Sequence, residues 1–291
     1  MARTEYLQPG TLEDLKNLLP TLPTNTAVLA GGTDLMPQIR TRHPDYECIL
    51  SLWNIPDLRV VEETTDGYLK IGAMVTHAAA ADNHLIRRYF RGLYMACSHV
   101  GSQQVRNKGT LGGSLVNASP AGDIAPCIFL YHGQLEILSQ DGSRRVDMDE
   151  FLFPDGKTCL QQGEILTAIY LPIDKELNSC FVKLGSRREV TIAQISLCAA
   201  WKNYSGKPEV LSAFVGAIDR RPCAFPNPGL LADLLTAEQA AQLLADQIRQ
   251  IRLKRTRPPK LKLTEAEQLY KERAAKGVVY DVVELIGAAE L

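Results

Sequence analysis

Residues 101–126 read GSQQVRNKGTLGGSLVNASPAGDIAP, a stretch in which glycine, serine, asparagine and proline outnumber the apolar residues. This composition predicts a long loop, and a long loop inside a compact domain usually carries function. A second glycine cluster, AGGTD at residues 30–34, follows the predicted buried strand AVLA. Glycine costs about 0.5–1 kcal/mol relative to alanine in a regular element, so adjacent glycines indicate a place where bare backbone is required.

The two glycine clusters suggest one anion site. Backbone N–H groups that no strand partner uses, with no Cβ in the way, can converge on phosphate oxygens. The hydroxyls of Thr33, Thr110 and Ser114 would add further donors. Tight turns with close packing are the alternative explanation, and they stay open here. The chain has no Rossmann fingerprint, no P-loop and no nucleophile elbow.

Composition limits the classes of function. The 291 residues are 45% hydrophobic and 22% charged with a net charge of -1, so no global field attracts nucleic acid or an anionic membrane. The N-terminus MARTEYLQPG lacks an apolar secretion signal, and no segment is apolar for long enough to span a bilayer, so we expect a cytoplasmic chain. Seven dispersed cysteines without a CxxC pair, and five dispersed histidines, favour reduced thiols and no metal site.

Apolar patterns divide residues 1–175 into two lobes. In residues 1–57, PGTLEDLKNLLP predicts a helix capped by Thr11, and AVLA, LMPQIRTR and CILSL predict a β-α-β unit. In residues 58–175, LRVVEET with YLKIGAM, and QLEILSQDGSRRVDM, predict two hairpins. Helical composition follows the first hairpin, and EILTAIYLP predicts a further strand.

We place a domain boundary near residue 175. In residues 176–291, FVKLGSRREVTIAQISLCAAWKNY and EVLSAFVGAI predict long strands joined at SGKP. Helices follow, and capping-box spacings occur at Thr236 with Gln239 and at Thr264 with Glu267.

AGGTDL followed downstream by residues 101–126 resembles the FAD-binding medium subunit of the molybdenum hydroxylases, the xanthine dehydrogenase and carbon monoxide dehydrogenase family. The resemblance continues through EILTAIYLP and FVKLGSRREVTIAQISLCA, and it fades after about residue 220. It implies the fold class α+β: a two-lobed FAD-binding domain of the vanillyl-alcohol-oxidase (PCMH) type, with FAD between the lobes, and a smaller α+β C-terminal domain of the molybdenum hydroxylase flavoprotein type.

The resemblance also implies site residues by motif position. Residues 28–35 would surround the FAD diphosphate, and residues 110–114 would approach it from the second lobe. Asp123 would bind a ribose hydroxyl, Leu166 and Lys183 would contact the flavin end, and Val100 would lie against the ring. The complete cofactor set is Val28, Leu29, Ala30, Gly31, Gly32, Thr33, Asp34, Leu35, Val100, Thr110, Leu111, Gly112, Gly113, Ser114, Asp123, Leu166 and Lys183.

Each assignment has a structural alternative. Asp34 and Asp123 are candidate helix caps, Val100 and Leu166 are candidate core residues, and Lys183 is a candidate surface cation. The family often has Asp-Ile-Ala where this chain has Thr191-Ile192-Ala193, which puts flavin tuning in question. Grouped cysteines for a [4Fe-4S] cluster are lacking, so FAD is the expected cofactor.

The implied function is electron transfer. Electrons would come from a small subunit with two [2Fe-2S] clusters, after a molybdenum large subunit oxidises a substrate, with xanthine or another purine the first choice. The flavin would pass them to a soluble acceptor such as NAD, in a dimer of heterotrimers. No catalytic residue is assigned in this chain, because the redox chemistry belongs to the cofactor.

Two other functions remain open. The basic stretch RLKRTRPPKLK, residues 252–262, could bind a polyanion in a non-enzymatic module. A stand-alone flavin reductase on the same fold is the second alternative, although no substrate-binding motif is found in the C-terminal part.

Overall fold

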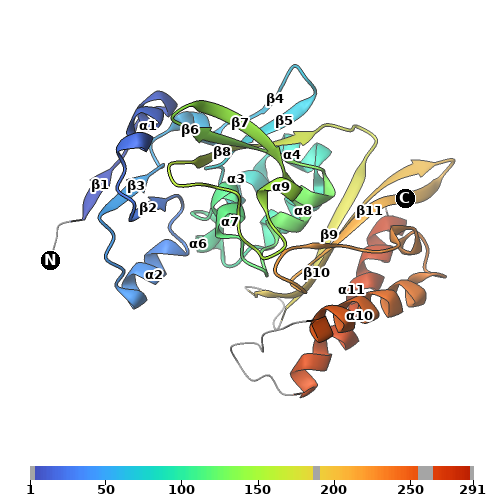
Figure 1. The fold of residues 1–291 in the computed structure, drawn as a ribbon. Coiled ribbons are helices and arrows are strands. Elements are labelled where there is room, and N and C mark those ends of the chain that lie inside the picture. The colour runs from blue at the N-terminus through green and yellow to red at the C-terminus, as the bar shows by residue number, and fades with distance from the viewer. Residues whose placement is uncertain (1–3, 186–190, 255–264, 289–291) are drawn as a thin grey trace.

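The computed structural model describes residues 4–185, 191–254 and 265–288. These residues form three β-sheets that follow one another along the chain, each with its own helices. Figure 1 shows the N-terminal sheet at one end of the molecule and the C-terminal sheet with two long helices at the other. The expected mixture of helix and sheet is confirmed.

The first sheet is parallel, in the order β1-β3-β2. Its crossover helices confirm the predicted β-α-β unit, and Thr11 caps α1 by accepting the Asp14 N–H at 3.0 Å. Pro37 lies in the first turn of α2, where its missing N–H costs no helical bond. The elements are β1 (Glu5–Leu7), α1 (Leu12–Leu18), η1 (Leu19–Thr21), β2 (Thr26–Leu29), α2 (Leu35–Arg42), β3 (Cys48–Ser51) and η2 (Pro56–Arg59).

The second sheet is antiparallel, in the order β4-β5-β8-β6-β7, and it contains both predicted hairpins. Strand β8 is buried along nearly its whole length, as its continuous apolar run predicts. The strands are β4 (Val61–Glu63), β5 (Tyr68–Gly72), β6 (Gln134–Ser139), β7 (Gly142–Asp147) and β8 (Ile165–Pro172).

The segment 101–126 is not a long loop, and that expectation is wrong. It contains helices α6 and α7 and the start of α8. Ser102 and Thr110, which indicate a turn by composition, are N-caps instead. The helices between the hairpins, with one after β7, are α3 (His77–Asp82), α4 (His84–Tyr89), α5 (Arg91–His99), α6 (Gln103–Arg106), α7 (Leu111–Asn117), α8 (Ile124–Leu130) and α9 (Met148–Phe151).

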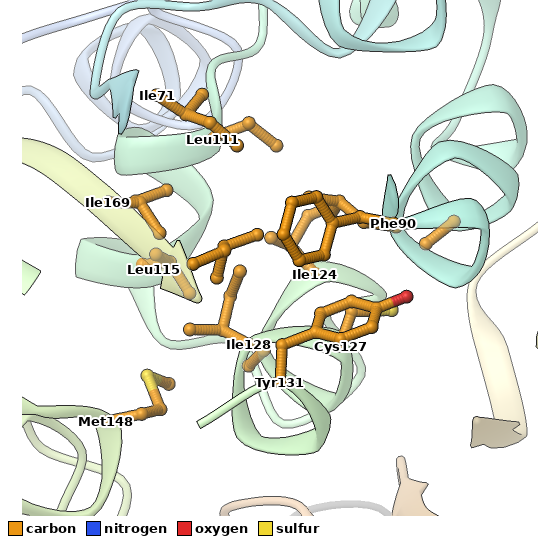
Figure 2. Packing of buried hydrophobic residues seen from close by; sticks show 14 of the residues in the cluster. Ile71, Phe90, Leu111, Leu115, Ile124, Cys127, Ile128, Tyr131, Met148 and Ile169 are labelled. Carbon is orange, nitrogen blue, oxygen red and sulfur yellow. The ribbon is translucent and has the colours of Figure 1, made fainter. Parts of the chain in front are cut away.

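Helix α7 is held by the main apolar core. Leu111 and Leu115 are buried at 0% and 1% exposure, and Figure 2 shows both pointing toward the same core as Ile169 of β8. Phe90 and Tyr131 meet edge to face in the same core, with ring centroids 5.0 Å apart. The helix is therefore fixed by its leucines, and its glycine and serine positions are left for another contact.

The third sheet is antiparallel, in the order β12-β11-β10-β9. The stretch FVKLGSRREVTIAQISLCAAWKNY, expected as one long strand, contributes to two paired strands. One face of the sheet packs on α5 and α8, and the other packs on α10 and α11. The elements are β9 (Asn178–Gly185), β10 (Ala193–Tyr204), β11 (Lys207–Gly216), β12 (Cys223–Ala224), η3 (Pro228–Leu231), α10 (Ala237–Lys254) and α11 (Glu265–Ala288).

Helix α10 begins after Thr236, as its capping-box spacing predicts. The Thr236 hydroxyl, however, donates to the carbonyls of Leu230 and Asp233, at 2.8 and 3.0 Å. Thr264 of the other capping box lies outside the described residues, as does most of the basic stretch 252–262. Among the described helices none is long and apolar enough to cross a bilayer.

All seven cysteines are free, and four are fully buried close to the contact between the second and third sheets. Two come from helices of the second lobe and two from strands of the third sheet. They are Cys97 in α5, Cys127 in α8, Cys180 in β9 and Cys198 in β10.

Candidate functional site

A cavity of about 340 Å³ lies where the first lobe meets the second. One wall is the loop between β2 and α2, and the facing wall is α7 with its cap Thr110. Strand β8 and the segment before it complete the lining. The predicted site residues that line it are Val28, Ala30, Gly31, Gly32, Thr33, Asp34, Leu35, Thr110, Gly112, Gly113, Ser114 and Leu166.

The first wall offers free hydrogen-bond donors. Within the described residues, the five backbone N–H groups of Gly31 to Leu35 donate to no protein acceptor. All five residues line the cavity, and four of them are half-buried. A row of adjacent free amides is the backbone arrangement that binds anions.

On the facing wall the amides of residues 111–114 already have protein acceptors, contrary to the expectation of free amides on both loops. The N–H groups of Leu111 and Gly112 donate to Val75 and Ala73, at 2.9 Å each. Those of Gly113 and Ser114 donate to the hydroxyl and the carbonyl of Thr110, at 3.0 Å each. Helix α7 can therefore contact a ligand through its side chains and its packing surface. The free amides of residues 31–35 come from the first loop.

The glycines of both walls are explained by neighbouring atoms that leave little or no room for a Cβ. A Cβ on Gly31 would overlap the carbonyl oxygen of Lys108, which belongs to the second lobe. A Cβ on Gly112 would lie 2.6 Å from that of Ala73. Gly32 has a φ of +73°, a conformation that a residue with a side chain rarely adopts. The two lobes thus touch through backbone beside the cavity, where Gly31 meets Lys108.

A second cavity of about 330 Å³ shares residues 31–33 with the first. Arg40 of α2 and Lys108 line it, and both are exposed cations. Lys108 also lies over the Trp53 ring, 4.6 Å from its centroid. The second cavity therefore places two cations on the far side of the amide loop, which favours an anionic ligand there, while Asp34 and Glu164 line the first cavity.

Two polar residues at or next to the first cavity were not predicted from the sequence. His77 is 2% exposed, and its Nε2 lies 3.1 Å from the Ser114 hydroxyl. Burial lowers the pKa of His77 to about 4, and the nearby Arg106 acts in the same direction. Glu164 lines the cavity and accepts hydrogen bonds from Nε and Nη2 of Arg144 at 3.1–3.2 Å. His77 belongs to no recognisable motif, and Glu164 begins the stretch EILTAIYLP, from which only Leu166 was expected at the site.

Asp123 and Lys183 form a buried ion pair at 2.6 Å, with side chains 7% and 8% exposed. The Lys183 ammonium also donates to the carbonyls of His99 at 2.7 Å and Thr191 at 3.3 Å. Asp123 Oδ1 is buried without a hydrogen-bond partner among the described residues. Burial raises the pKa of the Asp123 carboxyl, and the Lys183 charge opposes that rise.

The remaining predicted residues lie outside the cavity lining. Leu29 ends β2, Leu111 is in the core, and Val100 packs half-buried against that core. The alternatives are also informative: Asp34 and Asp123 occupy N-cap positions but make no capping bond. Leu166 is a buried residue that also lines the cavity, whereas Lys183 is no surface cation.

A family model described as the FAD binding domain in molybdopterin dehydrogenase matches residues 2–174. The chain belongs to this family. It is an FAD-binding subunit of the molybdenum hydroxylases, its cofactor is FAD, and it is part of an oxidoreductase.

Named relatives agree with this assignment. The nicotinate dehydrogenase FAD-subunit of Eubacterium barkeri is 30% identical over 94% of this chain and 93% of its own. The xanthine dehydrogenase FAD-binding subunit of Escherichia coli O157:H7 is 32% identical over 67% of both chains. The nicotine 6-hydroxylase medium subunit of Paenarthrobacter nicotinovorans is 32% identical over 57% of this chain, and the match spans 58% of that relative's length.

Solved structures show the same fold. Carbon monoxide dehydrogenase from Oligotropha carboxidovorans has a chain with a TM-score of 0.83 and 22% identity. Quinoline 2-oxidoreductase from Pseudomonas putida 86 has one with a TM-score of 0.83 and 24% identity. Both matches cover 98% of each chain.

Proposed function

We propose that the loop of residues 31–35 holds the diphosphate of FAD. The observation that carries this assignment is the row of five backbone N–H groups along one wall of the cavity, for which the described residues supply no acceptor. Phosphate oxygens accept hydrogen bonds and donate none, so they match such a wall. Arg40 and Lys108 on the far side of the loop add favourable charge. The residues present therefore fit the cofactor.

Helix α7 closes the same site from the second lobe. Gly112 lets the helix stand close to Ala73, and Gly113 leaves room beside Thr110 and Ala30, which line the cavity. Ser114 supplies a hydroxyl at the cavity wall, and Leu166 supplies an apolar contact for the flavin. We propose the same cofactor role for Val28 to Ala30, Leu111 and Val100 through packing around these contacts.

Asp123 is assigned to the adenosine ribose. Its buried Oδ1 has no partner among the described residues, and a ribose hydroxyl would supply the missing donor. The three N–H bonds of Lys183 already have three acceptors: Asp123, His99 and Thr191. We therefore assign Lys183 to holding Asp123 rather than to a direct flavin contact.

When bound, FAD supplies the two-electron redox chemistry that links iron-sulfur clusters to a soluble acceptor. The chain's own residues bind and orient the cofactor between the lobes and shield its diphosphate from water. We propose that electrons arrive from [2Fe-2S] clusters of a small subunit, after a molybdenum large subunit oxidises the substrate. The named medium and FAD subunits among its relatives support this arrangement.

Finer features of the assembly are proposals as well. Xanthine or another purine is the first substrate to test, supported by the xanthine dehydrogenase relative, and NAD is the first acceptor. We propose a cytoplasmic dimer of heterotrimers. The chain would consist of a vanillyl-alcohol-oxidase (PCMH) type domain over 1–175, with lobes 1–57 and 58–175, and a second domain over 176–291; the family match to 2–174 supports this division.

The first experiment is an absorption spectrum of the purified full chain, with the released chromophore identified by mass. Flavin bands and released FAD at about one per chain would support the diphosphate site. A folded, colourless chain that also fails to take up added FAD would overturn it. Electron transfer is tested separately, by adding the large and small subunits and following reduction of NAD with xanthine.

A further inference from the structure

A histidine that the cofactor motif does not include contacts the cavity wall through Ser114. The Ser114 hydroxyl lies 3.1 Å from His77 Nε2, and Ser114 lines the cavity. His77 itself is buried beneath that wall, at 2% exposure. Any effect of His77 on a ligand must therefore pass through Ser114.

The imidazole ring is held in place by the backbone. Residues 75–77 pair with residues 109–111 in a short antiparallel ladder, in which His77 N–H donates to the Gly109 carbonyl at 3.0 Å. A Cβ on Gly109 would lie 3.1 Å from His77 Cδ2 and 3.4 Å from Nε2. Glycine at 109 therefore leaves the space that the ring occupies, which ties His77 to the glycine motif.

The neutral ring has one N–H, and its position decides what Ser114 can do. Nδ1 is buried with no hydrogen-bond partner among the described residues. Buried donors without acceptors are rarer than buried acceptors without donors, so the proton belongs on Nε2. Nε2 then donates to the Ser114 oxygen. Because that bond uses a lone pair of Ser114 and leaves its proton free, the hydroxyl can donate into the cavity.

We propose that His77 is a positioning residue that presents the Ser114 hydroxyl proton to the phosphate oxygens of FAD. The proposal rests on the proposed diphosphate site. Phosphate oxygens need donors, and the opposite tautomer would direct the Ser114 proton to His77 and leave only lone pairs facing the ligand. His77 thus makes Ser114 a hydrogen-bond donor toward the cavity, like the free amides on the opposite wall.

The test is a double-mutant cycle on the full chain, with the dissociation constant of FAD measured by flavin fluorescence. We expect Ser114→Ala and His77→Met each to weaken FAD binding by about tenfold or more, the usual effect of losing a hydrogen bond to a charged group. In the Ser114→Ala background, His77→Met should have no further effect. His84→Met removes an exposed histidine at the first position of α4 and is the matched control.

Rescue separates positioning from packing. His77→Gln places an amide N–H near the Nε2 position and should keep FAD affinity close to that of the wild type. His77→Asn reaches only the Nδ1 position and should behave like His77→Met. If His77→Met does not fold, the Gln and Asn variants decide the question. Equal losses with and without Ser114, or equal affinities of the Gln and Asn variants, would overturn the proposal, whereas a wild type without FAD would overturn the diphosphate site itself.

Discussion

Gly32 shows how one residue controls the proposed diphosphate site. Its φ is +73°, and a Cβ there would lie 3.1 Å from the Met36 side chain and 3.2 Å from that of Leu29. We expect Gly32→Val to lose FAD, because a branched side chain would disturb the loop conformation in which these amides are free. The measurement is the flavin-to-protein ratio after purification.

Gly67 provides the matched control for Gly32. It has a φ of +86°, and a Cβ there would have no described atom within 4 Å, so Gly67→Val carries similar backbone strain far from the cavity. Its flavin content should be normal. Full flavin content in Gly32→Val would show that the loop does not hold the cofactor.

The lowered pKa of His77 also predicts how the free energy of unfolding depends on pH. Its pKa falls from 6.5 to about 4 on folding, so below pH 6.5 the unfolded chain binds a proton that the folded chain does not. Stability should therefore fall between pH 6.5 and 4, by up to about 3 kcal/mol. Urea unfolding at several pH values should show a smaller loss in His77→Gln than in the wild type. Parallel pH profiles for the two proteins would contradict this assignment.

At the scale of elements, helix α7 depends on its cap. Thr110 accepts the Gly113 N–H at 3.0 Å, and α7 spans seven residues. Thr110→Ala should destabilise the chain by about 0.5–2 kcal/mol and also weaken FAD, because α7 forms a cavity wall. Thr11→Ala removes an equivalent cap from α1, which also spans seven residues, and should lower stability alone. Denaturant unfolding and FAD titration of both variants make the comparison, and equal FAD affinity in the two would count against α7.

Several elements are predictable because their patterns are long or have clear turns. Both hairpins and β8 follow correctly from alternation, turn residues and a continuous apolar run. Helices α6 and α7 escape prediction because four and seven residues show little helical period, and their capping residues also favour turns. Strand β1, of three residues, offers no pattern at all.

The candidate site is predictable in the same uneven way. The glycine loops stand out locally, so the residues of the two facing walls are found from the sequence, whereas other lining residues such as Ala73 and Met74 are not. The bond between Ser114 and His77 joins residues 37 positions apart, and the pair of Asp123 and Lys183 joins residues 60 apart. Such contacts depend on tertiary packing, which single residues in a sequence do not reveal.

At the scale of the whole molecule, the ion pair of Asp123 and Lys183 joins the second lobe to the third sheet. Lys183→Met would leave a buried carboxylate without its partner, so we expect a loss of about 3–5 kcal/mol in unfolding free energy. Lys202→Met is the control, because Lys202 pairs with Asp174 nearer the surface, and it should cost about 1 kcal/mol or less. Equal losses in urea unfolding would place the stabilisation elsewhere.

The buried cysteines allow opening of the contact between the second lobe and the third sheet to be followed by thiol chemistry. Burial raises the pKa values of Cys97, Cys127 and Cys180, so these thiols stay protonated and poorly nucleophilic while the contact is closed. An alkylating reagent can reach them only when the sheet separates from the helices. The rate of thiol alkylation, mapped by mass, therefore measures how often the chain opens there, with no engineered cysteine needed.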